Sequence, residues 1–150
     1  MAAADPGAAA PGLAALQALL AAENAAVYGY GLAGAQLSGG LLTTATQDWT
    51  LHREARATVS EMIVKRGGTP RPAAAAYRPP FAVTSASSAR ALAALLEDGL
   101  VRAYLGLVAL DDATLRAFGA GEMQAAAIRA AYWRGGTTAF PGLDSASLGG

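Results

Sequence analysis

Charged side chains interrupt the apolar patterns of this chain, and they are the residues that could do chemistry. Glu23 stands in the middle of an apolar stripe with spacings of three and four, which is typical of one helix face. A lone carboxylate on a buried face is costly unless it is paired, hydrogen-bonded, protonated or bound to a cation. We therefore expect Glu23 to have a partner in the interior. The stripe consists of Leu13, Leu16, Leu20, Val27, Tyr30, Gly34 and Leu37.

Three later segments also place ionisable groups on apolar faces. Asp48 and His52 are four residues apart and so lie on the same side of a helix. Glu97 falls among apolar residues, and Arg56 lies at the border of an apolar face. Each segment thus offers at least one ionisable group to the interior. The expected buried polar network consists of Glu23, Asp48, His52, Arg56, Glu97, Glu122 and Arg129.

Two kinds of site would account for these groups. In the first, Arg56 and Arg129 neutralise the glutamates, because a planar guanidinium can meet a carboxylate with two hydrogen bonds. In the second, the carboxylates hold an iron or manganese ion. We expect the ion-pair network and no cofactor, and we keep the metal site as the alternative. Its ligands would be Glu23, His52, Glu97 and Glu122.

His52 beside Asp48 also has the composition of a general base oriented by a carboxylate. The sequence implies no nucleophile or substrate pocket beside this pair, so we expect a satisfied, half-buried histidine and assign no catalytic residue. The aromatic residues at helical spacing are expected to belong to the core. They are Tyr28, Tyr30, Tyr104, Tyr132 and Trp133.

The periodicity predicts four helices that position these groups. They span about residues 13–37, 43–66, 87–110 and 111–134. Ser87 or Ser88 is the expected N-cap of the third helix, and Asp111-Asp112 suits the start of the fourth. We expect one domain over residues 12–135 and weakly ordered tails over 1–11 and 136–150. In the second tail, Phe140-Pro141 could dock on the bundle.

The lengths of the connections predict the fold class. Only a few residues join the first two helices and the last two, so each pair should form an antiparallel hairpin. About 17 residues, rich in proline, join the two hairpins. Such a connector can extend along the whole bundle. We therefore predict an all-α four-helix bundle of ferritin-like arrangement, with two antiparallel hairpins joined by a long crossover. A simple up-down bundle remains open.

Composition excludes several classes of protein. The chain has equal numbers of acidic and basic residues, unlike a general nucleic-acid binder. It contains no cysteine, which excludes disulfides and thiol chemistry. The uncharged stretch 24–42 is rich in Ala, Gly and polar residues and lacks flanking basic anchors, so we expect no membrane span. The residues before Gly12 do not resemble a secretory signal, and a cytoplasmic location is expected.

Short motifs in the chain resemble the ferritin-like superfamily, in particular a bacterial ferritin-like family of unknown function. They are Leu16-Gln17-Ala18-Leu19-Leu20-Ala21-Ala22-Glu23, Tyr28-Gly29-Tyr30-Gly31, His52-Arg53-Glu54-Ala55-Arg56 and Ala131-Tyr132-Trp133-Arg134. In metal-binding members, two helices each give a Glu and two give Glu-x-x-His. The resemblance places Glu23 and Glu97 at the first two positions.

Both Glu-x-x-His motifs are broken in this chain. Trp49 stands three residues before His52, and Ala125 stands three residues after Glu122. The resemblance therefore implies a ferritin-like bundle without the usual metal centre, acting as a binding or interaction module. Gly29, Gly31 and Gly34 would permit close helix packing within the bundle or across a homodimer. The alternative is a metal-carboxylate protein, either an iron or manganese oxidoreductase or a metal store, with an atypical site.

Overall fold

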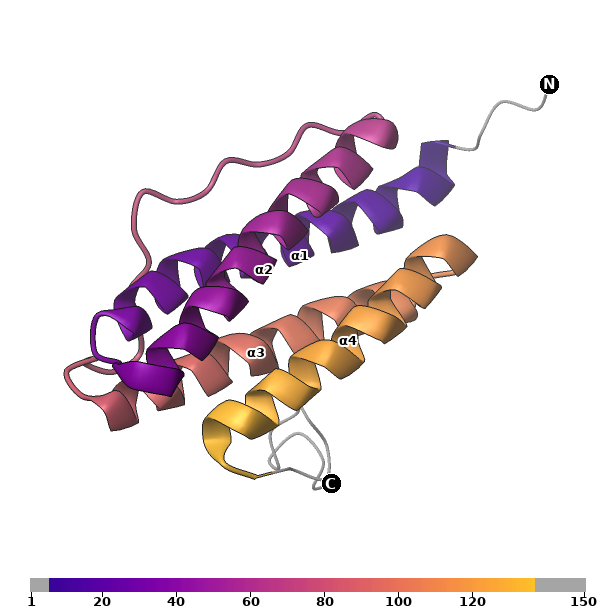
Figure 1. Ribbon diagram of the computed structural model, residues 1–150. Coiled ribbons are helices and arrows are strands. Elements are labelled where there is room, and N and C mark those ends of the chain that lie inside the picture. Colours follow the sequence, from indigo (N-terminus) through magenta and orange to yellow (C-terminus); the bar gives the residue numbers. More distant parts are fainter. Residues whose placement is uncertain (1–5, 137–150) are drawn as a thin grey trace, which may run out of the picture.

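Four helices make up the computed structural model, which describes residues 6–136 (Figure 1). No strand occurs among the described residues. The expected all-α four-helix fold is therefore confirmed. Residues 1–5 and 137–150, including Phe140-Pro141, lie outside the described part. The helices are α1 (Pro6–Gly34), α2 (Gly39–Lys65), α3 (Ala86–Val108) and α4 (Ala113–Arg134).

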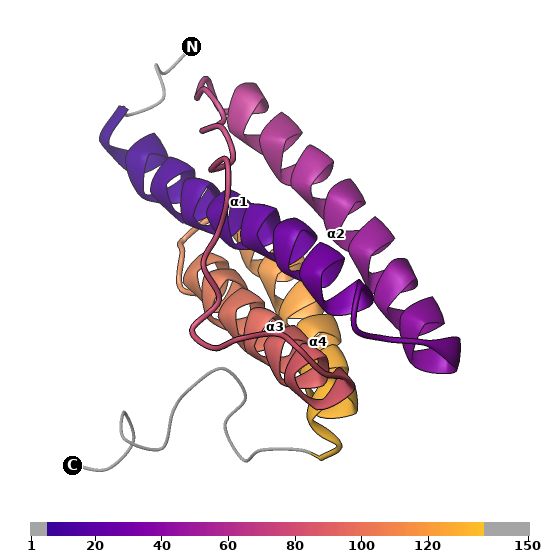
Figure 2. The ribbon, with the colours of Figure 1, turned by 90° about the vertical axis from the view of Figure 1, so that its left-hand side faces the viewer.

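The helices pair as two antiparallel hairpins (Figures 1 and 2). Short loops join α1 to α2 and α3 to α4, as their lengths predict. The closest helix pairs are α1 with α2, α1 with α3, and α3 with α4. Helices α1 and α3 thus form the centre of the bundle, and each hairpin adds one outer helix.

The connector over residues 66–85 runs along the bundle and brings the start of α3 near the start of α2, which confirms the predicted crossover (Figures 1 and 2). It passes over α1, where the Gln17 amide holds its first part. The Gln17 Nε2 donates to the Thr69 carbonyl at 2.7 Å, and its Oε1 accepts from the Arg71 N–H at 3.0 Å. Farther along, the Tyr77 ring contacts Tyr28, with centroids 5.5 Å apart.

Helix ends differ from the predicted ones by a few residues, and most at the start of α1. This helix begins at Pro6 rather than near Leu13 and continues through Pro11. Proline suits the first helical position because its missing N–H would have had no partner there. The N-cap of α3 is Ser85, so the assignment to Ser87 or Ser88 was wrong. Ser88 instead completes a capping box with Ser85.

Alanine and leucine fill most of the core, and glycine brings two helix pairs close together. A Cβ at Gly29 would lie 2.5 Å from Leu96 Cδ1, so this glycine permits the contact of α1 with α3. A Cβ at Gly119 would lie 2.9 Å from the Tyr104 backbone oxygen, at the contact of α4 with α3. By contrast, Gly31 faces open space, so it has no such role within the described part of the chain.

None of the four helices combines the length and the apolar character needed to cross a membrane. This holds for every helix within residues 6–136.

Candidate functional site

A cluster of ionisable side chains lies buried between the four helices. Helix α1 contributes Glu23, α2 contributes Asp48 and His52, α3 contributes Glu97, and α4 contributes Arg129. Glu23 and His52 are each 1% exposed and Glu97 is 0% exposed. The apolar periodicity that places leucines in the core also places these groups there, since they fall on the same helix faces. We call this cluster the polar network.

His52 lies at the centre of the polar network, between two carboxylates. Its Nδ1 is 2.8 Å from Glu23 Oε2, and its Nε2 is 2.9 Å from Glu97 Oε1. Carboxylate oxygens accept hydrogen bonds, so the ring meets both only when both of its nitrogens carry protons. Burial alone would lower the pKa of His52, but the two carboxylates outweigh it and raise that pKa to about 9. His52 is therefore an imidazolium cation at neutral pH.

Two tyrosines connect α1 and α3 reciprocally. The Tyr30 hydroxyl of α1 donates to Glu97 Oε1 of α3 at 2.6 Å, and the Tyr104 hydroxyl of α3 donates to Glu23 Oε1 of α1 at 2.7 Å. Burial and the neighbouring carboxylates raise the pKa of both phenols far above its ordinary value. Both tyrosines therefore remain protonated donors.

Glu97 is the acceptor that most donors share. Its Oε1 accepts from Tyr30, His52 and, at 3.0 Å, the Nε of Arg129. Burial would raise the pKa of this carboxyl, but the His52 and Arg129 cations and the hydrogen bonds lower it. Its Oε2 is buried without a hydrogen-bond partner among the described residues. Glu97 is thus a carboxylate that accepts all of these hydrogen bonds on Oε1 and none on Oε2.

Asp48 forms the end of the polar network next to the last turn of α4. Its Oδ2 accepts from the Trp133 indole Nε1 at 2.9 Å and lies 3.3 Å from the Tyr30 hydroxyl. Burial raises the pKa of Asp48, and the Trp133 hydrogen bond opposes that rise. Around His52, the cations His52 and Arg129 face the carboxylates of Glu23 and Glu97.

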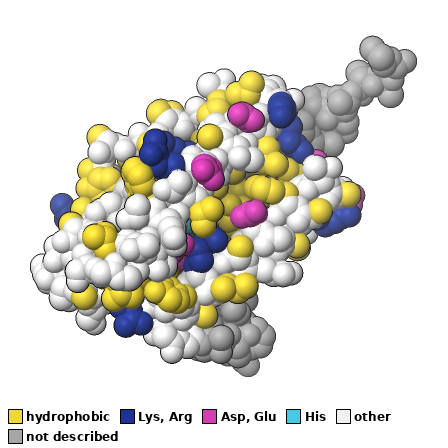
Figure 3. All heavy atoms as spheres, viewed as in Figure 1, with side chains coloured by type: hydrophobic (Ala, Val, Ile, Leu, Met, Phe, Trp, Pro, Cys, Tyr) yellow, Lys and Arg dark blue, Asp and Glu magenta, His cyan; other side chains and the backbone are white. Residues whose placement is uncertain are grey.

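Two of the expected members lie apart from these hydrogen bonds. Glu122 lines a cavity of about 280 Å³ between α2 and α4, together with Glu23, His52 and Arg129. Within the described region its carboxylate has no ion pair. Figure 3 shows basic and acidic side chains close together near the middle of this face.

The structure places Arg56 apart from the polar network. It lines a different hollow, with Asn24, Ser60 and the start of the connector, and within residues 6–136 no ion pair joins it to a glutamate. It stands four residues after His52, one helical turn farther along α2. The guanidinium that contacts the polar network belongs to Arg129, which pairs with Glu97.

Sequence reasoning assigned Tyr30, Tyr104 and Trp133 to the apolar core and missed their hydrogen bonds. One available signal was chemical, because a buried phenol or indole usually finds a partner for its O–H or N–H. Another was positional, because a tyrosine follows the buried glutamate by seven residues in both α1 and α3. A separation of 74 residues recurs in three pairs from the two hairpins: Glu23 and Glu97, Tyr30 and Tyr104, and Asp48 and Glu122.

The donor set of the polar network does not suit a metal ion. A metal ligand must offer a lone pair, and both ring nitrogens of His52 are already used as donors. Arg129 brings a fixed positive charge to Glu97, where a cation would have to bind. Among residues 6–136, no three His, Asp or Glu side chains are arranged to hold a metal ion.

Comparison with known proteins places the chain in a family. Among solved structures, the crystal structure of a conserved hypothetical protein, rv2844, from Mycobacterium tuberculosis is similar, with 32% identity and a TM-score of 0.79. The match covers 87% of this chain and 98% of that chain. No curated protein matches. The model of a domain of unknown function (DUF4439) matches residues 15–145, and the chain therefore belongs to the DUF4439 family.

Proposed function

We propose that this protein is a ferritin-like bundle that acts as a non-catalytic binding module, in which protonated His52 and Arg129 occupy the place of a metal centre. The contact that supports this proposal is the double hydrogen bond of His52 to Glu23 and Glu97. Ferritin-like metal proteins bring carboxylates from all four helices to a central ion. Here two organic cations balance the central carboxylates instead.

The alternative, an iron or manganese protein, would require a different protonation state. His52 would have to lose a proton and turn one nitrogen away from its glutamate, although the two carboxylates raise its pKa to about 9. Arg129 would also have to leave Glu97, because a divalent ion and a guanidinium repel each other at that distance. Both changes would cost free energy, which favours the metal-free protein.

Elemental analysis of protein purified without a histidine tag tests this proposal. The wild type, a Glu23→Ala variant and a Glu61→Ala variant are compared after growth in medium with added iron and manganese. Glu61 is an exposed residue of α2 and serves as a control with the same loss of charge. We expect far less than one metal ion per chain in all three proteins. Stoichiometric iron or manganese that is lost only in Glu23→Ala would replace this proposal with the metal alternative.

Homodimer formation is a separate part of the proposal. The packing glycine Gly29 is used within the bundle, against Leu96, so it does not support a dimer contact. Ile128 and Tyr132 of α4, at 71% and 49% exposed, are apolar side chains that a second copy would cover. Light scattering after gel filtration distinguishes a dimer from a monomer.

A further inference from the structure

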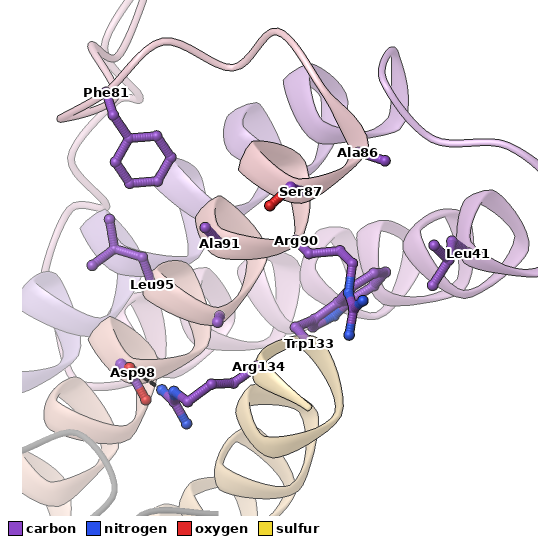
Figure 4. Close-up of a pocket in the computed structure, with 11 residues that line it drawn as sticks. Leu41, Phe81, Ala86, Ser87, Arg90, Ala91, Leu95, Asp98, Trp133 and Arg134 are labelled. Carbon is purple, nitrogen blue, oxygen red and sulfur yellow. Dashed lines mark hydrogen bonds and ion pairs between the residues drawn. The ribbon is translucent and has the colours of Figure 1, made fainter. Parts of the chain in front are cut away.

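Another hollow lies at one end of the bundle, apart from the polar network (Figure 4). Its walls come from the end of the connector, the first three turns of α3, the last turn of α4 and the start of α2. Its volume of about 620 Å³ falls in the range of small-molecule sites, about 300–1,000 Å³. Trp133 separates the two sites, since its ring lines this hollow while its indole N–H donates to Asp48.

Most of the wall of this hollow is apolar. Phe81 and Leu95 face it from the connector and α3, and each is 39% exposed although it is a large hydrophobic residue (Figure 4). The rest of the apolar lining consists of Leu41, the ring of Trp133 and three alanines, Ala86, Ala91 and Ala94. Apolar side chains that remain exposed around a concavity are typical of a binding surface, because a ligand that covers them removes their area from water.

One positive charge on the wall is unmatched. Three charged side chains line the hollow, and two of them, Arg134 and Asp98, form an ion pair with each other. The third, Arg90, has no carboxylate partner within residues 6–136, and its Nε is buried without a hydrogen-bond acceptor. A buried donor without an acceptor is destabilising, and a ligand oxygen that accepts its hydrogen bond would remove that cost. The lining therefore favours an anion.

We propose that this hollow binds a small amphipathic carboxylic acid, whose carboxylate meets Arg90 and whose apolar chain covers Phe81 and Leu95. A carboxylate matches a single guanidinium because two of its oxygens can accept from two parallel N–H groups. Asp98 Oδ1, buried without a donor among the described residues, would accept from a hydroxyl group on the ligand. The inference deepens the proposed function, since it rests on the idea that the bundle is a binding module and names its ligand class.

Decanoic acid is a suitable probe, with decan-1-ol and decyltrimethylammonium as probes of the same chain length without a negative charge. Binding to the full chain is measured by calorimetry and by tryptophan fluorescence, because Trp133 lines the hollow. We expect saturable binding of decanoate, about ten-fold tighter than decan-1-ol, and no binding of the ammonium compound.

Matched variants locate the binding site. Arg90→Gln should weaken decanoate binding about ten-fold and remove its advantage over decan-1-ol. Arg116→Gln makes the same change in charge near the start of α4, at the other end of that helix, and should leave binding unchanged. Ala91→Trp, which fills the hollow from an exposed position on α3, should abolish binding of both decanoate and decan-1-ol.

Three results would overturn the proposal: no decanoate binding to the wild type, equal binding to Arg90→Gln, or binding that occurs only in a Phe140→Ser variant. The last result would assign the hollow to residues 137–150 of the chain itself. Metal content is measured on the same preparations. A protein that holds stoichiometric iron and still binds decanoate through Arg90 would contradict the proposed metal-free network but support this site.

Discussion

Loss of the proton on His52 should lower the stability of the fold within an accessible pH range. The folded protein binds this proton with a pKa of about 9, whereas an exposed histidine has a pKa of 6.5. Because the folded pKa is the higher one, the stabilisation is fully present below pH 6.5 and is lost as the pH rises through about 9. The shift corresponds to about 3 kcal/mol, at about 1.4 kcal/mol per unit of pKa.

Urea unfolding followed by circular dichroism measures this loss. We expect the free energy of unfolding to fall steadily between pH 6.5 and 9 and to change less below that range. The chain contains a single histidine, so its imidazole signals in an NMR titration belong to His52 alone. Their midpoint should lie near pH 9, and at pH 7 both ring nitrogens should carry protons.

A His52→Gln variant is the control for the pH dependence. It should be less stable than the wild type at pH 6.5, since Glu23 and Glu97 lose the cation between them. It should also lose most of the slope between pH 6.5 and 9. A wild-type free energy of unfolding that stays level across this range would refute the reasoning, as would an NMR midpoint near 6.5.

Three further predictions concern packing, capping and the connector. Gly119→Ala should destabilise the fold by about 1–3 kcal/mol, because the new Cβ would lie 2.8 Å from Leu107 Cβ. Gly121 faces open space, so Gly121→Ala should stabilise the helix by about 1 kcal/mol. Thermal unfolding compares the two variants. Ser85→Ala should cost about 1 kcal/mol by removing the cap of α3, as measured by urea unfolding. Gln17→Ala should lower the free energy of unfolding by about 1 kcal/mol or less and speed proteolysis of the connector, because two hydrogen bonds to the connector are lost. Equal proteolysis rates for the wild type and the variant would contradict this role.

The fold was predictable because its signals are local. Spacings of three and four residues mark the helix faces, and short loops against one long connector distinguish two hairpins with a crossover from other bundles. The start of α1 was not predictable, since Pro11 ordinarily indicates a boundary but here lies inside the helix, which begins at Pro6. The cap of α3 was misplaced because several serines near its start are plausible caps.

The site was predictable only in its list of buried groups. Apolar periodicity shows that Glu23, His52 and Glu97 face the interior, but it does not show which donor meets which acceptor. Those pairs depend on how the helices rotate and slide against each other. Arg56 shows this limit, because one further turn along α2 takes its side chain to another hollow. Tyr30 and Tyr104 show it as well, since each bonds to a residue of the other central helix.

The polar network also fixes how the two hairpins dock. Four of its hydrogen bonds join one hairpin to the other: His52 to Glu97, Tyr30 to Glu97, Tyr104 to Glu23, and Trp133 to Asp48. Surfaces made largely of alanine and leucine look much the same after a slide of one helical turn, about 5.4 Å. That slide would break all four bonds together and leave charged groups alone in the core. The buried charges thus specify a single register between the two hairpins, which apolar packing by itself would not specify.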